Sequence, residues 1–450
     1  MRGLRGINFM LSSCVVSTKL KDGMLAVYNS IFCDPVFMSS EEFITVSDGK
    51  ITSDMYGILK RKGILVDDEQ DDLYRIDFVR EKVRDKIGTI NFVIMMMSDF
   101  CNLSCDYCIE KQYNIVEGKC MTNDVIDGFF QMVSSGLINL ASNVEFILYG
   151  GEPLLNLNGI KYFLDRKEIA LPESKCSIVT NAILLDEELV YFFKERKVNV
   201  GISIDGPKEI TDCHRKYKKG NGSVYDDVQK NLSYLCESGV EWSLSITVTD
   251  ELMNKKDRFF KWIGEVRPRT VAFNLLKLSF APTEATIATD YYKDASYFLV
   301  EAHMKLQEMK ITERDITRKI GYFLEHQPVV SDCAAASLNQ LTINTNGDIH
   351  ACQCYMNQMN TFGSVFDKTS YTIPMTSLKM FENLPINRAP CLKCNALPIC
   401  GGGCLVQGKT VYCNDKYLDE GYCEYAKNIM TWIFQRLYDS FRGDIPLEGR

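Results

Sequence analysis

The chain has 450 residues, of which 46% are hydrophobic and 24% are charged, and its formal net charge is −8. These proportions exclude a disordered, collagenous or fibrous protein, and the negative charge argues against nucleic-acid binding as the main task. No apolar run approaches the ~18 residues that span a bilayer, and the N-terminus lacks the features of a signal peptide. We therefore expect a cytoplasmic protein with neither a nucleic-acid nor a membrane partner.

Residues 1–88 form the first predicted domain, a small α+β module. Short apolar runs broken by Asp, Gly and Ser are followed by a helical pattern that begins near Ser53 and ends at Gly63. The acidic run 67–72 is interpreted as a solvated linker.

Residues 89–326 form the second predicted domain, of the α/β class. Continuously apolar segments alternate with segments of helical periodicity, which is typical of a parallel sheet with both faces covered. Six β-α units predict a partial (β/α)6 barrel, in which ligands bind at the C-terminal ends of the strands. The predicted strands are 91–97, 144–150, 176–181, 198–205, 240–249 and 270–278.

Residues 327–450 form the third predicted domain, which is rich in cysteine. The chain holds 18 cysteines against 4 histidines, and nine of the cysteines lie between Cys333 and Cys423. Such clustering favours metal ligation, because one metal centre needs several thiolates within a few ångströms. Scattered thiols such as Cys176 and Cys236 are expected to be small buried hydrophobic side chains. A final amphipathic helix is predicted over 423–441.

The most specific motif is a group of three cysteines directly after the first strand of the second domain. Cys101, Cys105 and Cys108 have the spacing C-x3-C-x2-C. Three thiolates in so short a loop suit three irons of a four-iron cluster and leave the fourth iron open. Three thiols grouped by chance, or a zinc site completed by a distant residue, are the alternatives.

This motif resembles that of the radical S-adenosylmethionine (SAM) superfamily, in which an aromatic residue, here Tyr107, precedes the third cysteine. The resemblance implies that SAM chelates the open iron and that reduction, by a flavodoxin- or ferredoxin-type protein, yields a 5′-deoxyadenosyl radical. It extends to the family's Gly-Gly-Glu-Pro motif, where Glu152 can accept a hydrogen bond from the methionine ammonium. The motif comprises Gly150, Gly151, Glu152 and Pro153.

Four further residues resemble family positions that line SAM. Ser203, Asp205 and Arg215 correspond to positions near the ribose and the methionine carboxylate, and a guanidinium suits a carboxylate. Asn181 follows the third strand, where it is either a SAM contact or only part of a turn. The lysines among residues 216–219 are interpreted as a solvated basic face.

The second cysteine group resembles the SPASM extension, which carries two auxiliary four-iron clusters and would bring the total to three [4Fe-4S] clusters. A zinc ribbon is the alternative for its central cysteines. The fourth ligand of the inner cluster is left open between Cys354, Cys413 and a substrate thiol. The resemblance assigns Cys391, Cys394, Cys400 and Cys423 to the outer cluster, and Cys333, Cys352 and Cys404 to the inner cluster.

The first domain resembles the winged-helix modules that capture a precursor's leader peptide as an added strand; a domain that merely supports the barrel is the alternative. Together the resemblances predict a radical SAM maturase of a ribosomally made precursor peptide. Thioether-forming maturases of the sactipeptide or ranthipeptide type are the expected relatives, so the product would be an intrapeptide crosslink, plausibly a cysteine thioether. The other readings are an anaerobic formylglycine-forming sulfatase maturase, which Gln353 disfavours because a general base is expected there, and a non-catalytic iron–sulfur electron carrier.

Overall fold

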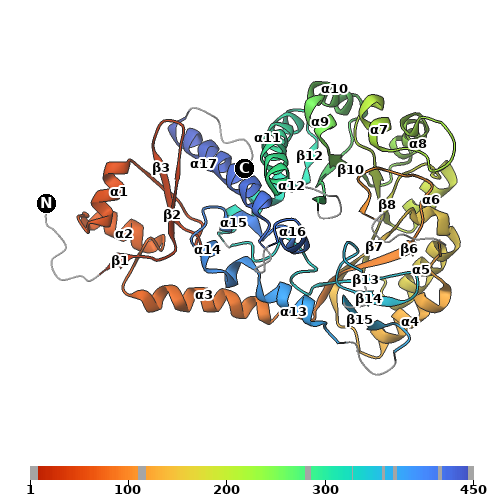
Figure 1. The fold of residues 1–450 in the computed structure, drawn as a ribbon, viewed down its shortest axis with the longest axis horizontal. Helices are drawn as coiled ribbons and strands as arrows, with labels where there is room; N and C mark the ends of the chain where they lie inside the picture. The colour runs from red at the N-terminus through yellow and green to blue at the C-terminus, as the bar shows by residue number, and fades with distance from the viewer. Residues whose placement is uncertain are drawn as a thin grey trace.

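The computed structural model describes residues 9–109, 118–278, 285–326, 328–356, 360–367, 372–413 and 418–443. Residues 1–8 and 444–450, which belong to the predicted terminal domains, lie outside these ranges. The N-terminal module lies beside the α/β core, and the C-terminal helix runs between them (Figure 1).

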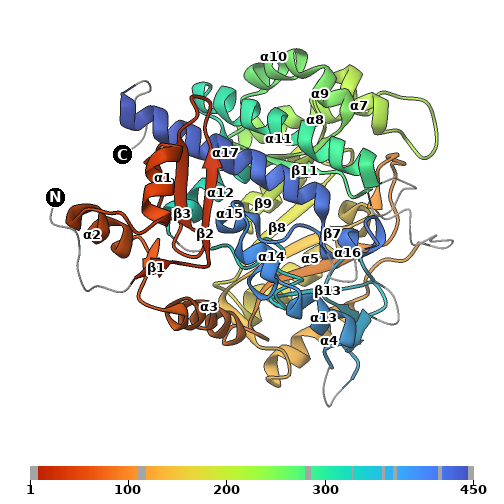
Figure 2. The ribbon, with the colours of Figure 1, turned by 60° about the vertical axis from the view of Figure 1, so that its left-hand side comes forward.

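The N-terminal module combines a three-stranded antiparallel sheet, in the order β2-β3-β4, with helices (Figure 2). Each helix begins at a side chain that accepts a hydrogen bond from the first turn: Ser39, Thr52 and Asp68. A separate pair, β1-β5, completes the module. The elements are β1 (Met10–Leu11), β2 (Val15–Lys19), β3 (Leu25–Asn29), β4 (Val36–Met38), α1 (Ser40–Ser47), α2 (Ser53–Arg61), β5 (Leu65–Val66) and α3 (Glu69–Arg84).

The interpretation of residues 67–72 as a solvated linker is wrong. Asp68 caps α3, and the acidic residues that follow form the first turn of this helix, where carboxylates interact favourably with the helix dipole. Asp72 is buried, and its carboxylate accepts hydrogen bonds from Ser12 Oγ at 2.7 Å and from Ser13 N at 2.6 Å. The acidic run therefore starts a helix and fastens it to the N-terminal strands.

The core is a ten-stranded sheet in the order β12-β11-β10-β9-β8-β7-β6-β13-β14-β15. Neighbouring strands from β12 to β13 are parallel, and the last two pairs are antiparallel. This mostly parallel sheet fits the predicted (β/α) core, and all six predicted strands are present. They are β6 (Ile90–Ser98), β7 (Leu140–Gly150), β8 (Lys175–Thr180), β9 (Val198–Ser203), β10 (Trp242–Val248) and β11 (Thr270–Leu275).

Helices follow the strands and cover one face of this sheet (Figure 1). Phe163 and Phe193 of these helices belong to the same buried core as the strand residues Cys176 and Ile178. Alternate positions of β8, such as Ser177, are only half-buried, so the expectation that both faces are fully covered does not hold there. The elements are α4 (Asn123–Ser134), η2 (Pro153–Asn156), α5 (Leu157–Ala170), α6 (Glu187–Glu195), α7 (Lys208–His214), α8 (Val224–Ser238), α9 (Asp250–Asn254), α10 (Lys256–Val266), α11 (Ala285–Glu308), β12 (Thr312–Glu313) and α12 (Arg314–Leu324).

The C-terminal region is built of short elements and one long helix. Its first strand, β13, pairs with β6, so the main sheet continues past residue 327. The long helix α17 packs against α11, and its Phe434 contacts Tyr28 of the N-terminal module. The elements are β13 (Gln340–Ile343), β14 (Asp348–His350), β15 (Thr361–Ser364), α13 (Met375–Glu382), η5 (Pro385–Asn387), α14 (Ala389–Leu392), α15 (Leu397–Cys400), α16 (Leu405–Thr410) and α17 (Glu420–Arg442). Among the described residues, none of the helices combines the length and apolar character that crossing a bilayer requires.

Candidate active site at the C-terminal edge of the sheet

The loop with Cys101, Cys105 and Cys108, here called the cysteine loop (residues 99–109), follows β6 at the C-terminal edge of the sheet. Its backbone is held by the segment after α7. Ser104 N donates to Lys216 O at 2.7 Å, and Lys218 N donates to Asn102 O at 3.0 Å. The basic segment 214–219 is thus more than a solvated face, since its backbone fixes the cysteine loop.

The Gly-Gly-Glu-Pro turn lies directly against the start of the cysteine loop. Gly151 N donates to Ser98 O and Glu152 N donates to Phe100 O, both at 2.9 Å. A Cβ atom on Gly151 would lie 2.2 Å from Phe100 O, and Gly150 has a φ of +142°. The two glycines are therefore required by the close approach of two protein backbones.

Glu152 is buried, and its carboxylate joins the turn after β7 to the end of β8. Its Oε1 accepts from Thr180 Oγ1 at 2.6 Å and from Leu154 N at 3.1 Å, while Oε2 accepts from Asn181 N at 2.8 Å. Burial raises the pKa of Glu152 from 4.5 to about 7, and these three hydrogen bonds partly oppose the rise. These bonds already use part of the carboxylate's capacity to accept hydrogen bonds. Contact of Glu152 with the methionine ammonium of SAM remains a prediction.

Asn181 contacts the cysteine loop directly. Its Nδ2 donates to Asn102 Oδ1 at 2.8 Å and lies 3.6 Å from Cys101 Sγ. The residue therefore does more than end a strand, although the structure does not test a contact with SAM. Ser203 is half-buried at the last position of β9.

Asp205 and Arg215 form a buried ion pair that is bonded to Tyr107 of the cysteine loop. Arg215 donates from Nε and Nη2 to the two oxygens of Asp205, at 2.9 and 3.0 Å. Asp205 also accepts from the Tyr107 hydroxyl and from Thr247 N. The guanidinium that was expected to meet a ligand carboxylate is thus held by a protein carboxylate, which is a strong bidentate geometry.

The three thiols of the cysteine loop are half-buried, and they lie close enough together that their charges affect one another's pKa. Burial raises the pKa of Cys101 to about 12, and the negative charges of Glu152, Cys105 and Cys108 add to this rise. Burial also raises the pKa of Cys105 to about 11, although the positive charge of Arg215 opposes it. Within the described residues, no three His, Cys, Asp or Glu side chains are close enough to hold a single metal ion.

The structure places four cysteines of the C-terminal region near one another, in and just after α14, at the end of α15 and at the start of α17. Burial raises the pKa of Cys423, and the charges of Cys400, Cys394 and Cys391 raise it further. Burial raises the pKa of Cys400 to about 12, and the charge of Lys319 opposes this shift. These four are the residues assigned to the outer cluster, whose metal content remains a prediction.

A second group of thiols lies close to the end of β11. Burial raises the pKa of Cys333, as does the charge of Cys352, whereas Lys277 lowers it. Burial also raises the pKa of Cys404, and the positive charge of Lys277 opposes this rise. The three thiols are those assigned to the inner cluster, and Lys277, at the carboxyl end of a predicted strand, is a neighbour that the sequence interpretation missed.

Of the two protein candidates for a fourth inner ligand, Cys354 lies with this group. Cys354 N donates to Cys352 Sγ at 3.3 Å, and Cys354 is buried. Cys413 is exposed. Among the scattered thiols, Cys176 is buried as expected, but Cys236 is exposed, so the expectation for Cys236 is wrong.

Solved structures share this fold. A structure described as native anSMEcpe with bound AdoMet superposes with a TM-score of 0.63 at 21% identity and covers 79% of this chain and 100% of its own. Streptococcus suis SuiB bound to precursor peptide SuiA superposes with a TM-score of 0.51 at 16% identity and covers 92% of this chain and 99% of its own. Both comparisons show that this chain shares its fold with these two proteins.

Sequence relatives agree with the fold. The cysteine-type anaerobic sulfatase-maturating enzyme of Clostridium perfringens is 24% identical over 77% of this chain and 97% of its own length. The radical SAM cyclopropyl synthase TigE of Paramaledivibacter caminithermalis is 24% identical over 90% of this chain and 87% of its own length.

The fold and the thiol-bearing loop at its C-terminal edge define an α/β enzyme core with SAM-dependent relatives. Residues 95–263 match the radical SAM superfamily profile, a range that contains the cysteine loop, the Gly-Gly-Glu-Pro turn, Asp205 and Arg215. This part of the chain is a radical SAM superfamily domain, and the chain is similar in sequence to a radical SAM cyclopropyl synthase and to sulfatase-maturating enzymes.

Proposed function

We propose that this protein modifies a ribosomally synthesised precursor peptide by radical chemistry and forms an intrapeptide crosslink in it. The observation that carries the proposal is the joining of the cysteine loop, the Gly-Gly-Glu-Pro turn and Asn181 into one hydrogen-bonded unit. This unit lies at the edge of a parallel sheet where such folds bind their ligands.

The residues of this unit fit a four-iron cluster with SAM. Cys101, Cys105 and Cys108 would hold three irons, and their sulfur ligands match what iron–sulfur clusters require. When bound and reduced, this group supplies a carbon-centred radical that abstracts hydrogen. Asp205 and Arg215 would hold the loop through Tyr107, and Asn181 would hold it through Asn102.

A peptide substrate is supported by how much of the chain the relatives cover. The match to TigE covers 90% of the chain, and the fold likeness to SuiB covers 92%, whereas the two sulfatase-maturating relatives cover 77% and 79%. SuiB has been solved with a precursor peptide bound. The extra coverage favours a precursor maturase, in which residues 1–88 recognise the leader.

A cysteine thioether is the crosslink that we favour. Its formation breaks one C–H bond and one S–H bond of the peptide and makes one C–S bond, so the peptide loses two hydrogen atoms. One would leave in 5′-deoxyadenosine, and the other would leave as a proton to solvent and an electron to an auxiliary cluster. Cys333, Cys352, Cys404 and the adjacent Cys354 would hold an auxiliary cluster near the site, and Cys391, Cys394, Cys400 and Cys423 would hold a second one.

Formylglycine formation in a sulfatase is the second candidate, because a sulfatase-maturating relative is matched over 97% of its length. The side chain of Gln353 counts against it. Gln353 Oε1 accepts a hydrogen bond from Gln340 Nε2 at 3.3 Å, and an amide cannot take up a proton at neutral pH.

Anaerobically reconstituted protein tests the proposal when it is given SAM, dithionite and the short peptides encoded beside its gene. We expect 5′-deoxyadenosine and a peptide that is lighter by two hydrogen atoms, with the thiol no longer alkylated by iodoacetamide. Formylglycine in a sulfatase-derived peptide would favour the second candidate. If no 5′-deoxyadenosine forms, both enzyme functions fail, and a non-catalytic iron–sulfur electron carrier is the function that is left.

A further inference from the structure

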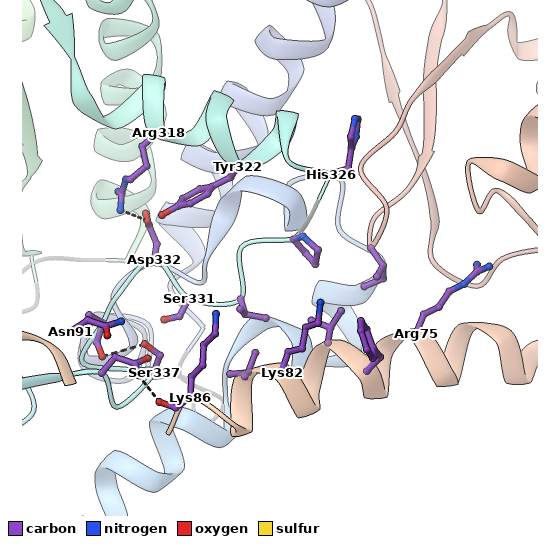
Figure 3. A pocket seen from close by; sticks show the side chains of 18 of the residues that line it. Arg75, Lys82, Lys86, Asn91, Arg318, Tyr322, His326, Ser331, Asp332 and Ser337 are labelled. Carbon is purple, nitrogen blue, oxygen red and sulfur yellow. Dashed lines mark hydrogen bonds and ion pairs between the residues drawn. The ribbon is translucent and has the colours of Figure 1, made fainter. Parts of the chain in front are cut away.

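A cavity of about 850 Å³ lies between the N-terminal module and the α/β core. Helix α3 forms one wall, and α12 with the segment before Ser337 forms the other (Figure 3). Lys82 extends from α3 and Lys86 from the turn that follows it, while Arg318 and Tyr322 extend from α12 on the opposite side (Figure 3). This cavity is separate from the cysteine loop, and nothing in the proposed radical chemistry uses it.

One face of α3 lines the cavity from Tyr74 to Val83, and Lys86 follows two residues after the end of the helix. Tyr74, Arg75, Phe78, Lys82 and Lys86 line the cavity, and their spacing of three or four residues places them on one side of a helix. Tyr74 and Phe78 are 75% and 48% exposed, although both are large and aromatic. An exposed aromatic row of this kind marks a surface that binds something.

The cavity is positively charged although the chain as a whole carries a charge of −8. Arg75, Lys82 and Lys86 form no ion pair with any residue that the structure describes. Arg75 lies 4.5 Å from the ring of Phe32, and its buried Nη1 has no hydrogen-bond partner in the described chain. Burying such a donor without a partner costs free energy, so the site is complementary to an anionic ligand.

The spacing of the charges shows what kind of anion would fit. Lys86 lies eleven positions after Arg75 and two beyond the last residue of α3, so at about 1.5 Å per residue of helix these charges are spread over roughly 14 to 16 Å. A single phosphate or carboxylate cannot reach both ends, whereas an extended peptide at about 3.3 Å per residue covers this distance with five residues. A hollow of this depth also suits a peptide better than the flat surface of a globular protein.

The far wall of the cavity leads toward the inner cysteines. Ser331 and Asp332 line it immediately before Cys333, and Asp332 pairs with Arg318 Nη1 at 2.7 Å. Arg318 and Asp332 also line a smaller cavity of about 160 Å³, together with Lys277. The ion pair therefore stands between the large cavity and the group of Cys333, Cys352 and Cys404.

We propose that the cavity between α3 and α12 binds an extended acidic segment of the precursor peptide, with its carboxylates on Arg75, Lys82 and Lys86 and its apolar side chains on Tyr74 and Phe78. This inference rests on the proposed function and deepens it. It places the docked segment on the helix face of the N-terminal module, whereas strand addition to the β2-β3-β4 sheet was the sequence-based expectation.

Peptide binding to the full-length reconstituted protein tests this inference. The probes are fluorescein-labelled ten-residue peptides of alternating Glu and Tyr, or of alternating Lys and Tyr. We expect the acidic peptide alone to bind, and the double variant Lys82→Glu/Lys86→Glu to bind it at least about tenfold more weakly, because two attractions become repulsions. Lys230→Glu/Lys261→Glu is the matched control, since it makes the same change of charge on exposed positions of α8 and α10.

Equal weakening in both double variants would overturn the inference, because it would reflect net charge alone; unchanged binding in Lys82→Glu/Lys86→Glu would do the same. Photocrosslinking gives a second measurement that does not depend on charge. With p-benzoylphenylalanine at Tyr74, the acidic peptide should be captured; the same group at Tyr297, which is 57% exposed on α11, should capture none. Capture of an acidic ferredoxin at Tyr74 in competition with the peptide would make the cavity a reductant site and overturn the inference.

Cofactor cleavage separates this inference from the proposed function. Lys82→Glu/Lys86→Glu should form 5′-deoxyadenosine from SAM and dithionite at the wild-type rate when no peptide is present, since the cavity is separate from the cysteine loop. If wild-type protein forms none, the proposed function fails, whereas undiminished peptide binding by the double variant defeats the cavity assignment alone.

Discussion

The two cysteine-rich regions of this chain are held in position by different kinds of secondary structure. The cysteine loop takes its three thiols from eight consecutive residues and is bonded to the ends of long parallel strands. The C-terminal region gathers its thiols from positions 333 to 423, most of them among helices of four to eight residues and short strands, with Cys423 at the start of the long helix α17. The first region is thus shaped by the sheet, whereas the second has few backbone ladders to shape it.

This difference indicates what each region would gain from metal. At the cysteine loop, Glu152, Lys216 and Lys218 already fix the backbone through hydrogen bonds. In the C-terminal region, the thiols of Cys391, Cys394, Cys400 and Cys423 lie near one another with little regular structure between them. We expect metal to add chemistry to the first region and to add both chemistry and folding free energy to the second.

The largest effect should come from removing the three thiols of the cysteine loop. Cys101→Ala/Cys105→Ala/Cys108→Ala should abolish 5′-deoxyadenosine formation and remove about a third of the iron, because one cluster of three loses its ligands. Cys120→Ala/Cys213→Ala/Cys236→Ala removes the same number of thiols outside both regions and should keep activity and iron. Chromatographic detection of 5′-deoxyadenosine and an iron assay measure the result, and undiminished cleavage would refute the assignment.

The next effect should come from Gly151→Ala, which leaves every thiol in place. The added Cβ would meet Phe100 O, so the turn and the cysteine loop must separate. A displacement of about 1 Å costs roughly 100-fold in rate, and we expect a loss of at least that size in 5′-deoxyadenosine formation. Gly321→Ala on α12 is the control, since nothing lies within 4 Å of its Cβ. Equal activity of both variants would show that the close approach is not required.

Cys391→Ala/Cys394→Ala sharpens the comparison between the regions. It should also remove about a third of the iron, yet leave cofactor cleavage within a few-fold of wild type. Unlike the triple variant, it should open the C-terminal region to trypsin at Lys379 and Lys393, because the metal would no longer hold the short helices together. Cleavage fragments identified by mass spectrometry measure this, and equal protection in both variants would mean that the two regions are supported alike.

Much of the α/β core could be predicted from the sequence. Six apolar strands and the motifs at their ends are strong local signals, and the parallel order follows from alternation with helices. Helix α3 was missed, because its first turn is acidic and only Asp72 and Ile76 of its 16 residues are buried. A helix that faces a cavity lacks the apolar periodicity on which prediction depends.

At the site, the residue types were predictable but their partners were not. Arg215 and Glu152 were expected to face a ligand, and each is instead bonded to neighbouring strands or loops. Such pairing depends on which strand ends lie side by side, which is a property of the sheet rather than of any short motif. Lys277 illustrates the same limit, since only the fold brings it to the inner cysteines.

The smallest effect that we expect is a pH dependence of stability from Glu152, measured on protein without metal. Burial raises its pKa from 4.5 to about 7, so between these values the folded chain holds a proton that the unfolded chain has released. The contribution of Glu152 to the free energy of unfolding should therefore be fully present below pH 4.5 and should be lost as the pH rises toward 7. The loss should amount to a few kcal/mol, at about 1.4 kcal/mol per pKa unit. Glu152→Gln should lack this part of the slope, whereas Glu195→Gln, at an exposed position, should keep it. Urea unfolding at several pH values measures the slope, and identical slopes for wild type and Glu152→Gln would mean that the carboxylate stays ionised through its bonds to Thr180 and Asn181.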